Sequence, residues 1–159
     1  MDSSEGLLQL SIINAESRDE TFTDASVYLL SRSAPAELVT RLDDLWYKTQ
    51  DIGGELVNIG RIIVCKIVDF VRANPNMVIG IAIGAAAGFL VNVIPFIGPL
   101  LAPLAMTAGA VIGAFTGVQM DSNNPNASMF ENAITVAKAF FCLLAEVFQS
   151  IATYWNSRG

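Results

Sequence analysis

The sequence predicts an all-α fold in which amphipathic helices flank a transmembrane glycine-zipper hairpin. Between Arg72 and Asp121 the chain runs for 48 residues without a charged side chain. A soluble protein of 159 residues seldom exposes so long an apolar block to water. Glycines recur at every fourth position in two parts of the block, which places each set on one helix face: Gly80, Gly84 and Gly88, then Gly109, Gly113 and Gly117.

The overall composition agrees with a membrane protein and argues against several other classes. Hydrophobic residues make up 53% of the chain and charged residues only 15%, respectively above and below the values of soluble domains. The net charge is -6 and the nine basic residues are scattered, so no nucleic-acid partner is expected. The two cysteines lie in apolar helical patterns, where free thiols are more typical than a disulfide.

Residues 1–33 form an acidic segment that we expect to be weakly ordered. Most of the acids of the N-terminal part lie here, and such segments are typically solvated. Short apolar stretches leave a strand, a short helix or little order open. The opening residues lack the basic start and apolar core of a secretory signal, so none is expected.

Residues 34–73 are predicted to form an amphipathic helical region. Pro35 and Glu37 suit the first turn of a helix, and leucines follow at helical spacing. Gly53-Gly54 indicates a break or hinge. A second helix, from Glu55 to Arg72, carries apolar residues on one side and both signs of charge on the other. Asn74-Pro75 ends it, because a residue before proline avoids the helical conformation.

Residues 77–120 are predicted to form the membrane hairpin. Its helices, 77–94 and 104–120, would be roughly 27 Å and 26 Å long at about 1.5 Å per residue, close to the ~30 Å hydrocarbon core of a bilayer. The corner between them is rich in helix-breaking residues: Pro95, Gly98, Pro99 and Pro103. The glycine faces have two interpretations, either close helix packing in lipid or a buried Ala/Gly-rich helix pair in a soluble protein.

After a polar loop, residues 128–155 are predicted to form a C-terminal amphipathic helix that starts with a capping box of Ser128 and Glu131. Its polar residues fall within a stripe of about 80°: Glu131, Thr135, Lys138, Cys142, Glu146, Gln149 and Thr153. In one interpretation the stripe lines a pore or faces neighbouring copies, which would pair its charges in alternating sign. Alternatively, the helix lies in the membrane interface or packs on the helix that ends at Arg72.

Residues that carry enzyme chemistry are missing from the sequence. It holds no histidine, no paired-cysteine motif, no phosphate-binding loop and no nucleophile elbow. We therefore expect no catalytic, cofactor or metal site. Arg61, Lys66 and Arg72 precede the first apolar helix, whereas the corner has no charge. The positive-inside rule then predicts an inner or plasma membrane location with a cytoplasmic N-terminus.

Two resemblances bear on function. Ala73-Asn74-Pro75-Asn76, followed by Gly80, Gly84 and Gly88, resembles small bacterial inner-membrane proteins with an amphipathic helix and a glycine-zipper segment. That resemblance covers about 50 residues and implies a ribosome-associated or stress-related membrane anchor. The hairpin with flanking amphipathic helices also resembles, in architecture alone, the hydrophobic hairpin of pore-forming colicins and related helical toxins.

Three functional hypotheses follow, and all leave out catalysis. The favoured one is a small membrane protein that self-assembles through its glycine faces and acts as a pore-forming or membrane-perturbing effector. The second is a non-conducting anchor or scaffold whose residues 1–72 bind a cytosolic protein. The third is a soluble protein in which partner subunits cover the apolar block. The partners expected are therefore a lipid bilayer, further copies of the chain and a cytosolic protein.

Overall fold

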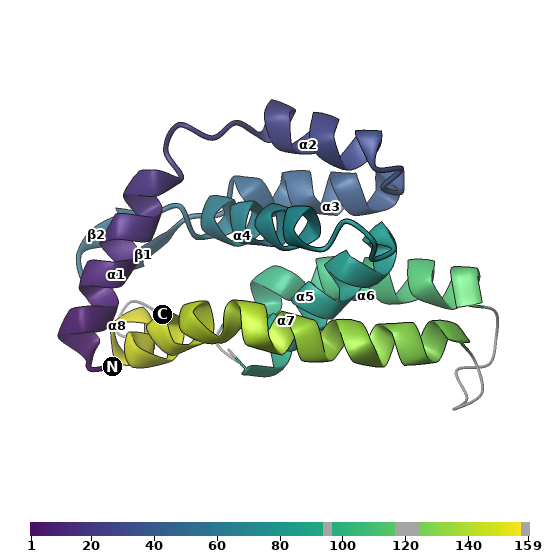
Figure 1. Ribbon diagram of the computed structural model, residues 1–159. Coiled ribbons are helices and arrows are strands. Elements are labelled where there is room, and N and C mark those ends of the chain that lie inside the picture. Colours follow the sequence, from purple (N-terminus) through teal and green to yellow (C-terminus); the bar gives the residue numbers. More distant parts are fainter. Residues whose placement is uncertain (94–96, 117–124, 157–159) are drawn as a thin grey trace.

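Helices make up most of the chain in the computed structural model, which describes residues 1–93, 97–116 and 125–156 (Figure 1). The all-α class is thereby confirmed, apart from one short β-hairpin. The elements are α1 (Ser3–Glu16), α2 (Phe22–Ser31), α3 (Ala36–Trp46), β1 (Gln50–Ile52), β2 (Glu55–Val57), α4 (Ile59–Ala73), α5 (Ile79–Val93), α6 (Gly98–Thr116), α7 (Pro125–Ser150) and α8 (Ala152–Asn156).

The first 33 residues form two helices in place of the weakly ordered segment that we expected. Each helix has an N-cap side chain that accepts a hydrogen bond from a backbone N–H in the first turn. Asp2 accepts from Glu5 at 2.8 Å in α1, and Thr21 accepts from Asp24 at 3.2 Å in α2. The buried side chain of Asn14 also accepts from the backbone N–H of Asn58 at 3.0 Å, which ties α1 to the start of α4.

The predicted hinge at Gly53-Gly54 is the turn of the β-hairpin. Both glycines have positive φ, 62° and 85°, which is the geometry of a two-residue hairpin turn that glycine adopts without strain. The turn pairs β1 with β2 in antiparallel register, with Ile52 opposite Glu55. Residues 55–57 are therefore a strand, and the helix that we predicted from Glu55 begins only at Ile59.

The apolar block forms a helical hairpin of α5 and α6, but its boundaries differ from the prediction. Helix α6 begins at Gly98, so Gly98, Pro99 and Pro103 belong to the helix and not to the corner. Pro99 lies in the first turn, where its missing N–H has no helical role. Pro103 lies inside the helix and removes one hydrogen bond to the preceding turn. Pro95 is outside the described residues.

Helix α5 lies at the centre of the fold. It packs against α4, α6 and α7, while α6 also contacts α3. Figure 1 shows α7 running beside the α5–α6 hairpin, with α2 and α3 beyond α4. Every residue of α5 from Ile79 to Ala87 is buried. Nine consecutive positions cover more than two turns at about 3.6 residues per turn, so α5 is enclosed on every side by the chain's own helices.

Candidate functional site: the enclosed hairpin and its surroundings

The glycine faces occupy different environments in the two helices of the hairpin. In α5, Gly80 and Gly84 are buried and Gly88 is half-buried, whereas Gly109 of α6 is exposed. A Cβ added at Gly88 or Gly109 would meet no atom within 4 Å beyond its own stretch of helix. Neither glycine therefore marks a close helix contact within one chain. Gly113 lies where only the backbone of α6 is described, and Gly117 lies outside the described residues. Glycine-zipper packing stays a prediction.

Two other glycines lie where helices approach each other closely. A Cβ at Gly60, in the first turn of α4, would overlap the carbonyl oxygen of Leu45 in α3. A Cβ at Gly6 in α1 would overlap the hydroxyl of Ser150 at the end of α7. The sequence analysis missed both, because each glycine stands alone and forms no repeated spacing.

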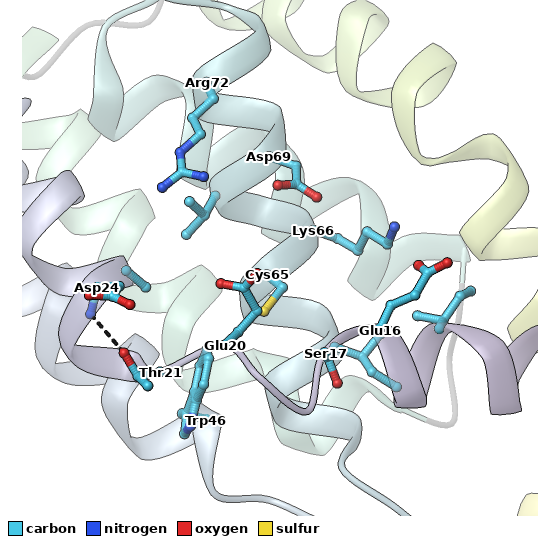
Figure 2. Close-up of a pocket in the computed structure, with 14 residues that line it drawn as sticks. Glu16, Ser17, Glu20, Thr21, Asp24, Trp46, Cys65, Lys66, Asp69 and Arg72 are labelled. Carbon is cyan, nitrogen blue, oxygen red and sulfur yellow. Dashed lines mark hydrogen bonds between the residues drawn. The ribbon is translucent and has the colours of Figure 1, made fainter.

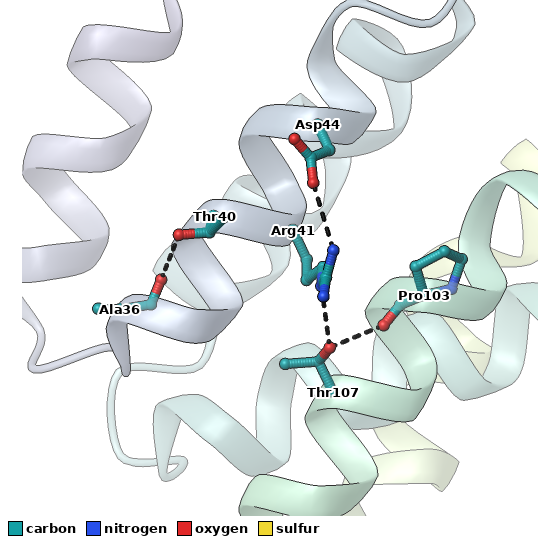
Figure 3. Close-up of polar contacts among 6 residues, drawn as sticks. All are labelled: Ala36, Thr40, Arg41, Asp44, Pro103 and Thr107. Carbon is teal, nitrogen blue, oxygen red and sulfur yellow. Dashed lines mark hydrogen bonds and ion pairs between the residues drawn. The ribbon is translucent and has the colours of Figure 1, made fainter.

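A polar contact joins the second helix of the hairpin to α3 (Figure 3). Arg41 of α3 donates from Nε to Oγ1 of Thr107 in α6 at 3.3 Å, and its Nη1 lies 3.5 Å from Oδ2 of Asp44. The Thr107 hydroxyl in turn donates to the carbonyl oxygen of Pro103 at 2.9 Å. Arg41 and Thr107 thus link the amphipathic region to the apolar hairpin by side chains alone.

A second arginine fixes the chain where the hairpin begins. Arg32, at the end of α2, donates from Nη2 to the carbonyl oxygen of Pro75 at 2.9 Å and from Nη1 to the Tyr28 hydroxyl at 2.9 Å. The guanidinium of Arg72 lies over the Tyr28 ring, 4.6 Å from its centroid, a cation–π arrangement. Helix α2 therefore holds the connection between α4 and α5 through charged side chains.

A pocket of about 200 Å³ opens among α1, α2, α3 and α4 (Figure 2). Trp46, Ile13 and Ile62 contribute apolar lining. Four carboxylates and two cations surround it: Glu16, Glu20, Asp24, Asp69, Lys66 and Arg72. Within the part of the chain that the structure describes, no ion pair joins these groups, and no cluster of acids and cysteines could hold a metal ion.

Cys65 also lines this pocket, and its surroundings hold it in the thiol form. Its sulfur lies beside Glu20 in Figure 2. The pKa of Cys65 is raised from 9.0 to about 11, chiefly by burial and additionally by the nearby carboxylates of Glu20 and Asp69. Because the thiolate is the reactive form, the pocket does not activate Cys65 for nucleophilic chemistry.

The polar stripe of the C-terminal helix lies on the outer face of α7. Six of its residues are exposed along α7: Glu131, Thr135, Lys138, Cys142, Glu146 and Gln149. Thr153 is also exposed but belongs to α8, beyond the turn at Ile151. The opposite face is buried, with Ala137, Phe141, Leu144 and Phe148 among its residues, and packs on α5. On one flank of the stripe, Val136 and Leu143 are 39% and 56% exposed.

One stretch of the described chain, Glu131–Ser150 in α7, is long and apolar enough to cross a membrane. The stretch is 20 residues long, and 39% of its most apolar 18-residue window is buried inside the protein. The apolar part of α5, Ile79–Asn92, is shorter. This finding is weak support for a membrane location and gives no topology, since a core helix of a soluble protein has the same composition.

Comparison with known proteins adds no relative. No protein-family model matches the chain, and neither the curated proteins nor the solved structures give a significant match.

Proposed function

We propose that this chain is a non-enzymatic, membrane-inserting protein whose α5–α6 hairpin enters a lipid bilayer and perturbs it. The observation that carries the proposal is the enclosure of α5: an uncharged helix, buried from Ile79 to Ala87, inside amphipathic helices of the same chain. Such an arrangement keeps the more apolar helix of the hairpin out of water until a bilayer offers an equally apolar environment. The membrane is an inner or plasma membrane, with the N-terminus on the cytoplasmic side.

The contacts between the α5–α6 hairpin and the surrounding helices, which we call the shell, are of a kind that lipid can replace. Burial of apolar side chains supplies most of the attraction, and lipid tails replace it because they are as apolar as a protein core. Among the described residues, the polar side-chain contacts that would break are few and partly exposed: Arg41 with Thr107, and Arg32 with the carbonyl oxygens of Pro75 and Met77. Once the hairpin is in lipid, the glycine faces at Gly80, Gly84 and Gly109 become available for packing against other copies.

Dye release tests the proposal directly. The full chain is added to phospholipid vesicles loaded with a self-quenched dye, and membrane binding is followed by flotation. We expect the chain to float with the vesicles and to release the dye. Recovery of the chain in the supernatant, with the vesicles intact, would overturn the proposal and leave the soluble alternative.

Two threonines in Figure 3 provide a matched pair of variants for testing how the hairpin is released from α3 before insertion. Thr40 and Thr107 each donate to a carbonyl four residues earlier, at 3.0 Å and 2.9 Å, but only Thr107 also accepts from Arg41. Thr107→Val removes a charged hydrogen bond between shell and hairpin, which is worth about 1 kcal/mol. We expect dye release about fivefold faster than for Thr40→Val. Equal rates would show that this contact does not hold the hairpin back.

A second candidate, a non-conducting anchor or scaffold, is favoured by the position of the pocket. All the residues that line it lie between Ile13 and Arg72, within the segment that this hypothesis assigns to a cytosolic protein partner. An anchor would float with the vesicles but leave the dye inside. A pull-down that compares the unchanged chain with a pocket variant, for example Glu16→Lys, would then test whether a partner binds at the pocket.

A further inference from the structure

The polar residues of α7 are spaced symmetrically about Cys142. Lys138 and Glu146 lie four residues before and after it, and Thr135 and Gln149 lie seven residues before and after it. All five are exposed on the same face of the helix, because intervals of four and seven residues return to one side of an α-helix. The polar positions are therefore symmetric about Cys142, with the base Lys138 on one side matched by the acid Glu146 on the other.

The charged side chains of this face have no ion-pair partners among the described residues. Lys138 and Glu146 are eight residues apart, and Glu131 precedes Lys138 by seven, whereas charge pairs along one helix need three or four. Within the described residues, neither Lys138 nor Glu146 makes a hydrogen bond or an ion pair. Both side chains are therefore available to pair with groups outside the chain.

We propose that the outer face of α7 is the interface of an antiparallel, two-fold homodimer centred on Cys142. A two-fold axis there places residues at equal distances from Cys142 opposite each other in the two copies. Lys138 then faces Glu146 of the second copy, and the same pair forms again by symmetry. A parallel arrangement would place Lys138 against Lys138 and Glu146 against Glu146, which is repulsive. The charge pattern therefore selects a second copy as the partner and the antiparallel direction.

The remaining residues of the face fit the same arrangement. Thr135 lies opposite Gln149 of the second copy, and its hydroxyl, which donates to the Glu131 carbonyl at 3.2 Å, keeps lone pairs that can accept from the Gln149 amide. The two-fold axis also keeps Leu143 of both copies on one side of the seam, close to its centre. This exposed leucine lies at the edge of the seam, about 100° around the helix from Cys142.

Cys142 provides a probe at the axis. Packed helices are about 8–10 Å apart with Cα atoms about 2.3 Å from each helix axis, which places the two Cys142 Cα atoms about 3.4–5.4 Å apart. Disulfides need roughly 4.4–6.8 Å between Cα atoms. Diamide, a membrane-permeant oxidant, takes two electrons and two protons from the two thiols and becomes the hydrazine while the sulfur–sulfur bond forms.

The first experiment treats cells that express the full chain with diamide and separates the products on a non-reducing gel. We expect most of the chain at twice the 17.0 kDa of the monomer. Cys142→Ser should abolish the dimer band, whereas Cys65→Ser should leave it unchanged. A band that depends on Cys65, or a chain that stays monomeric in all variants, would overturn the proposal.

Charge exchange tests the ion pairs. Lys138→Glu places two acids opposite each other at both ends of the seam, and Glu146→Lys places two bases there. Each substitution should reduce the cross-linked fraction at least fivefold, and the double variant should restore it to within twofold because it reverses both pairs. Circular dichroism of each variant confirms that the helices are intact. Equal losses in the single and double variants would contradict the pairing.

A mixed-cysteine experiment tests the direction. In a Cys142→Ser background, one tagged copy carries Thr135→Cys and a differently tagged copy carries Gln149→Cys. The antiparallel dimer predicts a cross-link between the two tags and none between identical copies, whose cysteines would lie about 21 Å apart at 1.5 Å per residue. Cross-links between identical copies would indicate a parallel dimer. The result is independent of membrane insertion, because the interface uses the face of α7 that points away from α5.

Discussion

Helices α5 and α7 are both apolar and pack against each other, yet they have opposite relations to the surroundings of the protein. Helix α5 is buried on all sides along Ile79 to Ala87 and carries no charge. Helix α7 buries one face against α5 and exposes a stripe that includes Lys138, Cys142 and Glu146. The helix with the more apolar composition is the one that the chain shields on all sides along Ile79 to Ala87.

High hydropathy alone does not distinguish a helix that fills a protein core from a helix that is long enough to span a membrane. At about 1.5 Å per residue, the 15 residues of α5 give roughly 22 Å, short of the ~30 Å core of a bilayer. The 20-residue stretch of α7 reaches that length. Helix α5 therefore has a length suited to a protein core or to one leaflet of a bilayer. Helix α7 is long enough to span a bilayer and has an exposed face that a partner could contact.

The largest effect is expected from a charge placed in each helix. Ala85 of α5 is fully buried, and Ala139 of α7 is exposed. Ala85→Asp buries a carboxylate without a partner and should reduce the free energy of unfolding by about 4 kcal/mol or more. Ala139→Asp should change it by less than about 1 kcal/mol. Urea unfolding followed by circular dichroism measures both, and similar losses would show that α5 is not enclosed.

Adjacent leucines compare the two faces of α7 itself. Leu144 is 5% exposed and Leu143 is 56% exposed. Leu144→Ala should destabilise the chain by about 2–5 kcal/mol, because it removes buried methyl groups and leaves a cavity. Leu143→Ala should stay within about 0.5 kcal/mol in the monomer. If Leu143→Ala were the more destabilising of the two, the inward and outward faces would be assigned the wrong way round.

The two cysteines allow a partly buried position, Cys65, to be compared with an exposed one, Cys142. The pKa of Cys65 is raised from 9.0 to about 11, so at pH 8 its thiolate population should be roughly 100-fold lower in the folded chain than in urea. In a Cys142→Ser variant, iodoacetamide should therefore alkylate Cys65 far more slowly under native conditions. Equal rates with and without urea would indicate that the burial of Cys65 is lost in solution.

The same pKa shift has a consequence for stability at alkaline pH. Below about pH 9, Cys65 is a neutral thiol in both the folded and the unfolded chain and does not favour either. Between about pH 9 and 11 the unfolded chain ionises first, so folding loses stability as the pH rises. Cys65→Ser should reduce this loss. An unchanged pH profile would assign the alkaline sensitivity to other groups.

Periodicity made the helical class predictable, because leucines in α3 and the polar stripe of α7 recur at helical intervals. Periodicity did not determine the structure of residues 1–33 or of the Gly53-Gly54 turn, which depends on local hydrogen bonds and backbone geometry. The caps at Asp2 and Thr21 turn an acidic segment into helices, and the positive φ of Gly53 and Gly54 turns a supposed hinge into a β-hairpin. Pro103 was assigned to a corner because proline usually ends a helix, but here it lies inside α6.

The candidate site was predictable only where one helix carries it. The stripe of α7 lies on a single element, so its spacing is visible in the sequence. The enclosure of α5 depends on α4, α6 and α7 together, and the pocket combines side chains from Ile13 to Arg72. Burial on all sides and pocket shape arise from tertiary packing, which no pattern along one helix reports.

The smallest predicted effect concerns a glycine of α5. A Cβ at Gly88 would meet no neighbour within 4 Å beyond its own helix, whereas a Cβ at Gly60 would overlap the Leu45 carbonyl. Gly88→Ala should therefore stabilise the chain by about 0.5–1 kcal/mol through better helix propensity, and Gly60→Ala should destabilise it. A loss of stability in Gly88→Ala would mean that α5 is packed more tightly there than the structure shows. If the variant instead gains stability but associates less in membranes, Gly88 serves contacts between copies, as the glycine-zipper hypothesis predicts.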